Sequence, residues 1–124
     1  MQPGEIYLAA FPFGDVPGMK LRPVLLLTSG PGLVPEVLVA YISLVIPSQL
    51  LPSDLILDPA QPEFQPCNLK VESALRLHKL ATIHCSSLVR HLGNIGPIQQ
   101  AVVAVKLRAL LGFEAHGPRR HLVV

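Results

Sequence analysis

Thirteen prolines, distributed over 124 residues, restrict how this chain can fold more than any other feature of the sequence. A proline fixes its own φ angle, has no N–H to donate, and disfavours helix at the residue before it. The prolines of the N-terminal half, among them Pro23, Pro35, Pro47 and Pro52, leave only short apolar segments between them. Segments of that length favour β-strands joined by loops.

Five apolar segments have the length and composition of β-strands. The longest, Val37 to Ile46, is rich in β-branched residues and too continuous to be half exposed, so it predicts a central strand buried on both faces. Leu75 to Ile83 alternates, and Leu75, Leu77, Ala81 and Ile83 are expected on one face. The other predicted strands are Glu5 to Phe11, Val24 to Thr28 and Asp54 to Leu57.

The clearest helix begins at Pro97, a residue that suits the first helical position, and ends before Gly112, a natural stop. We therefore expect a helix over about 97–111. A short helical turn is expected at about 87–92, capped by Ser86 and Ser87. One face of the long helix should consist of Ile98, Ala101, Val102, Val105, Ala109 and Leu110.

The order of these segments, strands first and one helix last, favours a small, strongly bent sheet or barrel closed by the helix. The length favours one domain over 1–124, with the barrel at about 4–85 and a flexible tail at 114–124. The proline-rich segment 58–66 and the polar segment 68–73 are expected to be loops.

The composition bears on partners and compartment. Half of the residues are apolar and only 15% are charged, below the ~25% of an ordinary soluble domain, so we expect an oligomer that buries part of this surface. The net charge of +2 favours a nucleic-acid partner only if the cations gather on one face. Two cysteines, no signal-peptide pattern and no apolar run of about 18 residues indicate a cytoplasmic protein.

The segment from Phe11 to Ser29 is a candidate anion site. Lys20 and Arg22 follow a loop rich in glycine and proline, and Pro23 holds Arg22 in an extended conformation before the apolar run that begins at Val24. A cation held where a loop meets a strand can bind a phosphate. The alternative interpretation is a surface hairpin with two solvated cations.

Other kinds of site have weaker support in the sequence. It contains no Cys-x-x-Cys pair, no His-Glu-x-x-His helix and no phosphate-binding glycine motif. His84 and Cys85 are adjacent but lack a local signature of a cysteine nucleophile, and Cys85 is interpreted as an apolar filler.

Besides a metal site and a cysteine nucleophile, the sequence allows a third kind of site, one for metal-free RNA cleavage. This chemistry needs a base for the ribose 2′-hydroxyl, a fixed cation that stabilises charge at phosphorus, and an acid for the leaving 5′-oxygen. Arg22 suits the second task because its forked donors match phosphate oxygens, and Ser43 could donate a hydrogen bond to the same phosphate. The base is not evident. Lys70, Ser73 and Arg76 complete this candidate set, although they could equally be solvated or structural residues.

Several short motifs, in the right order over roughly residues 4–112, resemble the MazF/PemK toxin family. They are Gly4-Glu-Ile-Tyr-Leu8, Phe11-Pro-Phe13, Lys20-Leu-Arg-Pro-Val-Leu-Leu-Leu-Thr-Ser29, Val37-Leu-Val-Ala-Tyr-Ile-Ser43, Asn68-Leu-Lys-Val-Glu-Ser73 with Leu75-Arg76, Lys79-Leu-Ala-Thr-Ile83, Leu92-Gly-Asn-Ile-Gly96 and the helix from Pro97 to Gly112. The family's usual Thr-Ser pair reads Ser43-Leu44 here, which keeps a hydroxyl and loses the second one.

The resemblance implies a small SH3-like barrel of the MazF/PemK/CcdB type with a C-terminal helix, forming a homodimer. It implies a toxin that cleaves single-stranded mRNA sequence-specifically through a 2′,3′-cyclic phosphate, without a metal or other cofactor, and that is blocked by an antitoxin peptide. Arg22 and Ser43 would be catalytic, and the RNA-binding residues would be Phe13, Lys20, Lys70, Ser73 and Arg76. Two alternatives remain, since fold does not settle function: a non-catalytic toxin directed at a protein such as gyrase, and a degenerate member that binds only a partner peptide.

Overall fold

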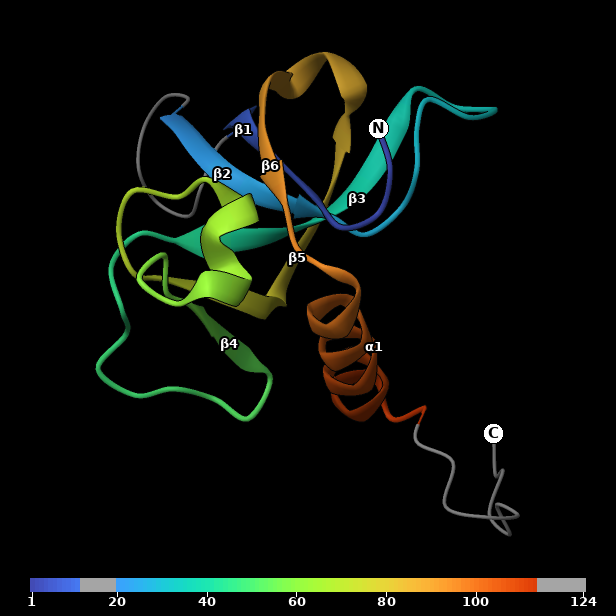
Figure 1. Cartoon of the computed structure of the whole chain (residues 1–124). Coiled ribbons are helices and arrows are strands. Elements are labelled where there is room, and N and C mark those ends of the chain that lie inside the picture. The colour runs from blue at the N-terminus through green and yellow to red at the C-terminus, as the bar shows by residue number, and fades with distance from the viewer. Residues whose placement is uncertain (12–19, 114–124) are drawn as a thin grey trace, which may run out of the picture.

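Six strands form one antiparallel sheet, and an α-helix follows it, in the computed structural model, which describes residues 1–11 and 20–113 (Figure 1). The strand order is β4-β5-β3-β2-β1-β6. The prediction of a mainly-β fold with a C-terminal helix is confirmed. The elements are β1 (Glu5–Phe11), β2 (Lys20–Leu26), β3 (Glu36–Ser43), β4 (Asp54–Leu57), the 3-10 helix η1 (Pro62–Cys67), β5 (Ser73–His84), the 3-10 helix η2 (Cys85–Ser87), β6 (Leu88–Asn94) and α1 (Pro97–Leu111).

The predicted strands agree best with the structure where an apolar segment has the same bounds as the segment that pairs in the sheet. β1 and β4 have the predicted bounds, and β3 is central, between β5 and β2. β2 begins earlier than predicted, at Lys20, because its first residues pair with β1. β3 stops at Ser43 rather than Ile46, since the Ser43 hydroxyl donates to the Val45 carbonyl at 2.6 Å and closes a turn.

A bulge in β5 overturns the predicted alternation of that strand. Ala40 of β3 pairs with Leu80, but the next residue, Tyr41, pairs with Arg76, so residues 77–79 are extra on the β5 side. Leu75 and Leu77 therefore face the main core, whereas Ile83 belongs to a second cluster on the other face. Such a bulge bends its strand and increases the local twist, which helps the sheet to curve.

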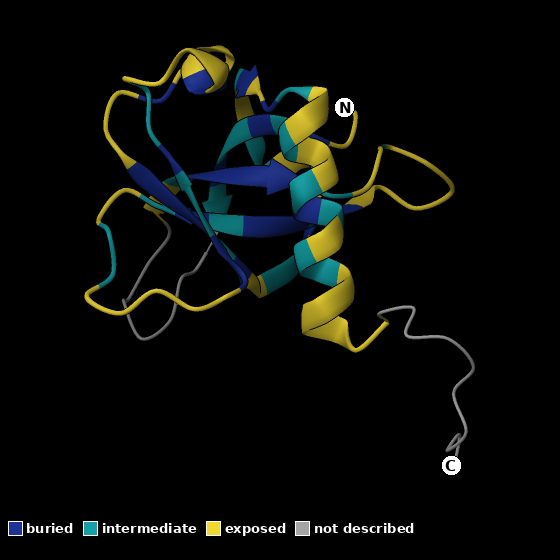
Figure 2. Ribbon diagram, turned by 60° about the horizontal axis from the view of Figure 1, so that its bottom comes forward, coloured by how far each residue is buried: buried dark blue, intermediate teal, exposed yellow. Residues whose placement is uncertain are grey.

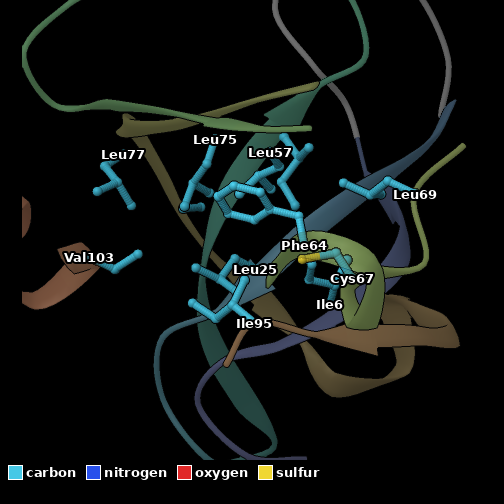
Figure 3. Packing of buried hydrophobic residues seen from close by; sticks show 12 residues of the cluster. Ile6, Leu25, Leu57, Phe64, Cys67, Leu69, Leu75, Leu77, Ile95 and Val103 are labelled. Carbon is cyan, nitrogen blue, oxygen red and sulfur yellow. The ribbon is translucent and has the colours of Figure 1, made fainter. Parts of the chain in front are cut away.

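The main core lies inside the bend, and side chains from β1–β5, η1 and α1 fill it (Figure 3). Figure 3 shows the Phe64 ring among the labelled side chains of this cluster. The second cluster lies on the opposite face of the sheet, here called the outer face. Its buried residues are Ala9, Val24, Leu26, Val37, Val39 and Ile83.

The prediction of a plain loop over 58–66 is wrong, because η1 occupies most of that segment and packs between the two edges of the sheet. Among the described residues, β4 and β6 do not pair with each other. Phe64 and Cys67 of η1 are buried, and the Asn68 side chain donates to the Leu92 carbonyl of β6 at 3.0 Å. A Cβ added to Gly93 would lie 2.2 Å from the Pro66 carbonyl oxygen, so this approach requires glycine. Packing by η1, rather than strand pairing, covers the seam of the bent sheet.

The helical turn predicted at 87–92 is also wrong. Only residues 85–87 form a 3-10 turn, with His84 Nδ1 accepting a hydrogen bond from the Ser86 N–H, and the following segment is strand β6. The edge of β1 selects this conformation, because it offers backbone partners to the segment from Leu88 to Asn94.

Helix α1 has the predicted bounds but not the predicted buried face. Pro97 begins it, and Gly112, at φ 76°, ends it with its N–H donating to the Ala109 carbonyl. Val103 is the buried helix residue, whereas Val105 on the predicted face is 61% exposed, and Figure 2 shows the outward side of the helix largely in yellow. Apolar residues of the helix itself lie on all of its sides, so periodicity alone did not identify the side that packs against the sheet. Within the described residues, no helix is long and apolar enough to cross a membrane.

Candidate nucleic-acid interface

One row of residues crosses all six strands on the outer face. Each member pairs directly with the next, and directly opposed residues in an antiparallel sheet share a face. The row therefore brings together side chains that are far apart in the sequence. We call it the cross-strand row, and it consists of His91, Tyr7, Val24, Tyr41, Arg76 and Asp54.

Arg22 and Ser43 lie one step along the strands from this row. Arg22 pairs with Ala9, two residues from Val24, so it shares the outer face with the row. The β2–β3 register, in which Val24 faces Tyr41, aligns Arg22 with Ser43 when it is continued by two residues. The two residues proposed as catalytic from the sequence are thus in register on neighbouring strands.

Pro23 explains why β2–β3 pairing stops just before this point. The Leu27 N–H donates to the Leu38 carbonyl, so the backbones of alternate residues of β2, including residue 23, face β3. Pro23 has no N–H to continue the ladder. Arg22 and Ser43 consequently stand where the two strands are no longer joined.

The two side chains differ in how free they are to bind an anion. The Arg22 guanidinium donates to the Leu21 carbonyl at 3.0 Å, and no carboxylate within the described ranges pairs with it. The Ser43 hydroxyl both donates to the Val45 carbonyl and accepts from the Val45 N–H. Arg22 is thus an uncompensated cation, whereas Ser43 must release the Val45 carbonyl before it can donate to a ligand.

Arg76 reaches the outer face but is held in an ion pair. Its Nε lies 2.8 Å from Oδ1 of Asp54, whose carboxyl is 1% exposed and also accepts the Leu51 N–H. His78 Nδ1 lies 3.9 Å from the same oxygen. The contribution of Arg76 is therefore to hold β5 against β4, with its charge largely neutralised.

The remaining residues proposed from the sequence are distributed unevenly. Lys20 is exposed and shares the face of Arg22 at the start of β2. Lys70 is exposed between η1 and β5, outside the strands that carry the cross-strand row. Ser73 is fully buried and its hydroxyl donates to the Val71 carbonyl, so the structure does not present it to a ligand. Phe13 lies outside the described residues.

Several side chains that the sequence analysis did not select as site residues also belong to this surface. The Lys79 amine lies 5.4 Å from the centroid of the Tyr41 ring. The rings of Tyr7 and His91 meet edge to face at 5.2 Å, and His91 Nε2 lies 3.2 Å from Oε2 of Glu5. Burial, together with the Glu5 carboxylate, raises the pKa of Tyr7. Strand alternation could have placed Tyr41 beside Ser43, but no sequence signal joined β6 to β1.

Among the described residues, the charges on this face that have no oppositely charged partner are all positive. Lys20, Arg22 and Lys79 are cations, whereas the acidic groups Glu5 and Asp54 are both engaged with basic partners. Three cations therefore share this face, whereas Arg90 on β6 and the basic residues of α1 do not belong to it. Cations interleaved with tyrosine rings suit single-stranded nucleic acid, whose phosphates and bases they contact respectively.

Metal and thiol chemistry find little support in the described part of the chain. No three His, Cys, Asp or Glu side chains gather there into a group that could hold a metal ion. Burial raises the pKa of Cys67 to about 11, which keeps its thiol protonated near neutral pH and therefore unreactive.

Comparison with known proteins gives one family and a consistent fold. Residues 2–111 match the family described as PemK-like, MazF-like toxin of type II toxin–antitoxin system. No curated protein matches the chain significantly by sequence. Among solved structures, the M. tuberculosis toxin MazF-mt6 has TM-score 0.67 at 23% identity, covering 87% of this chain and 96% of that one.

Two further solved structures have the same fold at lower identity. An endoribonuclease from a mycobacterial species has TM-score 0.64 at 15% identity and covers 90% of this chain and 91% of its own. A mycobacterial endoribonuclease in complex with its cognate antitoxin has TM-score 0.67 at 15% identity, and the alignment covers 92% of this chain and 97% of that one.

Proposed function

The chain belongs to the PemK-like, MazF-like toxin family of type II toxin–antitoxin systems, and from this premise we propose that it is an endoribonuclease of single-stranded mRNA. Two of the solved structures with its fold are described as endoribonucleases. The proposed reaction needs no metal. The ribose 2′-oxygen bonds to phosphorus, the bond from phosphorus to the 5′-oxygen breaks, and the products are a 2′,3′-cyclic phosphate and a 5′-hydroxyl.

The position of the Arg22 guanidinium is the observation that supports this function most directly. No carboxylate among the described residues pairs with this guanidinium, which lies on the outer face in register with Ser43 and shares that face with Lys20. In the proposed mechanism its forked donors stabilise the extra negative charge that develops on the phosphate oxygens. Ser43 turns its hydroxyl from the Val45 carbonyl to the same phosphate. Lys20 binds the RNA backbone at the edge of the site.

The proposal extends to partners and compartment. The toxin acts in the cytoplasm, recognises a specific RNA sequence, and is neutralised by an antitoxin peptide, as the described complex of a mycobacterial relative supports. It acts as a homodimer, in agreement with the exposed apolar side chains of α1.

The test is cleavage of a long single-stranded RNA by the purified full chain in EDTA. Wild type is compared with Arg22→Ala and with Arg108→Ala, which removes a cation from the exposed end of α1. We expect discrete cuts by wild type and Arg108→Ala, and a loss of about 100- to 1,000-fold in kcat for Arg22→Ala. The absence of cutting by folded, antitoxin-free wild type would overturn the ribonuclease proposal, and equal cutting by Arg22→Ala would overturn the role of Arg22.

A further inference from the structure

Tyr41 and Lys79 form a paired aromatic and cationic group at the bulge between β3 and β5. Tyr41 is half-buried in the middle of the cross-strand row, and Lys79 is an exposed member of the extra segment 77–79. The Lys79 amine lies 5.4 Å from the Tyr41 ring centroid, within the range of a cation–π contact. A regular β5 would pair Tyr41 with Lys79, because its neighbour Ala40 pairs with Leu80; the bulge puts Arg76 there instead.

The distance from Arg22 suits a nucleotide. Tyr41 precedes Ser43 by two residues on one face of β3, which corresponds to about 7 Å along the strand. A phosphate held between Arg22 and Ser43 therefore has Tyr41 at about the separation between neighbouring units of an extended single strand. The adjoining base can reach the ring while its phosphate remains at the guanidinium.

The charge around the ring favours nucleic acid over a purely structural contact. Arg76, directly opposite Tyr41, already satisfies Asp54, so Lys79 is left without a carboxylate partner among the described residues. The exposed Lys79 ammonium lies over one face of the half-buried Tyr41 ring, where it can contact a phosphate, and the opposite face of the ring is the one on which a base would stack.

We propose that Tyr41 and Lys79 form a stacking subsite for the nucleobase next to the phosphate at Arg22. This inference rests on the proposed function, because it takes that phosphate as the scissile one. The Tyr41 ring stacks on the base, and the Lys79 amine contacts a flanking phosphate. Every base has a π-face, so the subsite accepts different bases and strengthens binding to single-stranded RNA generally.

The experiment measures the Kd of the full chain for a short single-stranded RNA by fluorescence anisotropy. The RNA spans a mapped cut and has a 2′-deoxyribose at the scissile position, so that it is not cleaved; if no cut is found, oligoadenylate replaces it. Each base near the cut is removed in turn to give an abasic position. Wild type is compared with Tyr41→Phe, which keeps the π-face, and with Tyr41→Leu, which removes it.

We expect Tyr41→Leu to weaken binding about 5- to 100-fold and Tyr41→Phe to stay within about twofold of wild type. One abasic position should weaken wild-type binding by a similar factor, and should have little further effect on Tyr41→Leu. Independent, multiplying effects of the two changes would overturn the inference. Because the abasic series on wild type needs no variant, insensitivity at every position would overturn it even if Tyr41→Leu failed to fold.

The two proposals fail in different ways. If wild type cuts RNA but binds abasic and intact RNA equally, the stacking subsite is wrong and the ribonuclease stands. If wild type does not cut but shows base-dependent binding that requires the Tyr41 ring, the ribonuclease proposal is wrong. No binding to either RNA would overturn both.

Discussion

The Nε of Arg76 on β5 donates to Oδ1 of Asp54 on β4 at 2.8 Å, and the Asp54 carboxyl is almost completely buried. The second carboxylate oxygen accepts the Leu51 N–H at 2.7 Å. One carboxylate thus joins the short edge strand to β5 and fixes the loop before it. The pair has a structural role, which distinguishes Arg76 from Arg22, a residue without a carboxylate partner in the described part of the chain.

Replacing Asp54 by Ala should therefore be strongly destabilising. It leaves the partly buried Arg76 guanidinium and the Leu51 N–H without this carboxylate, a loss of about 3–5 kcal/mol in the free energy of unfolding. Asp58→Ala is the matched control, because within the described residues one hydrogen bond, from the Ala60 N–H, reaches the Asp58 carboxylate, and about 1 kcal/mol is expected. Urea unfolding at one protein concentration measures both, and equal losses would contradict the structural assignment.

Ser43 should tolerate threonine better than alanine. Ser43→Ala removes the hydroxyl that is proposed to donate to the phosphate, and a hydrogen bond to a charged group is worth about 10- to 100-fold in kcat/KM. Ser43→Thr keeps the hydroxyl and adds a methyl that restricts its rotamers, so near wild-type activity is expected. Cleavage rates for the three proteins decide the matter, and full activity of Ser43→Ala would remove Ser43 from the mechanism.

Gly93 should be essential to the seam between η1 and β6. An alanine Cβ there would lie 2.2 Å from the Pro66 carbonyl, and backbone must move to relieve the contact, at a cost of about 1–3 kcal/mol or more. At Gly32 a Cβ would meet no atom within 4 Å, so Gly32→Ala should leave stability nearly unchanged or slightly raised. Thermal unfolding of both variants checks this, and a stable Gly93→Ala protein would show that η1 does not approach β6 as described.

Stability should fall in alkaline solution partly because of Cys67. Its pKa is raised from 9.0 to about 11 by burial, so the unfolded chain loses the thiol proton first. The contribution of this group is fully present below about pH 9 and is lost progressively as the pH rises to about 11, by roughly 2–3 kcal/mol.

The comparison that isolates this effect is wild type against Cys67→Val, because tyrosines and lysines titrate in the same range. Urea unfolding at a series of pH values should show a smaller alkaline loss in the variant. Parallel curves for the two proteins would mean that Cys67 is not the titrating group.

Local chemistry explains which parts of the fold could be predicted from the sequence. Pro97 and Gly112 delimit α1 through their own backbone preferences, and β1 and β4 follow from short apolar runs between breakers. The segment predicted as a loop, 58–66, contains most of η1, because η1 forms only when Phe64 and Cys67 pack into the core and Gly93 admits the backbone. The turn predicted at 87–92 became β6 because β1 was available to pair with it.

The residues of the candidate site can also be divided into those that the sequence identified and those whose role depends on the tertiary structure. The sequence by itself determined the family, the cation Arg22 held extended by Pro23, and the hydroxyl of Ser43, since these depend on residue type and neighbours. Only the tertiary structure decided that Ser73 is buried, that Arg76 is neutralised by Asp54, and that Tyr41 lies beside Lys79. Strand register and the β5 bulge set these outcomes, and both arise from backbone pairing between segments that are distant in the chain.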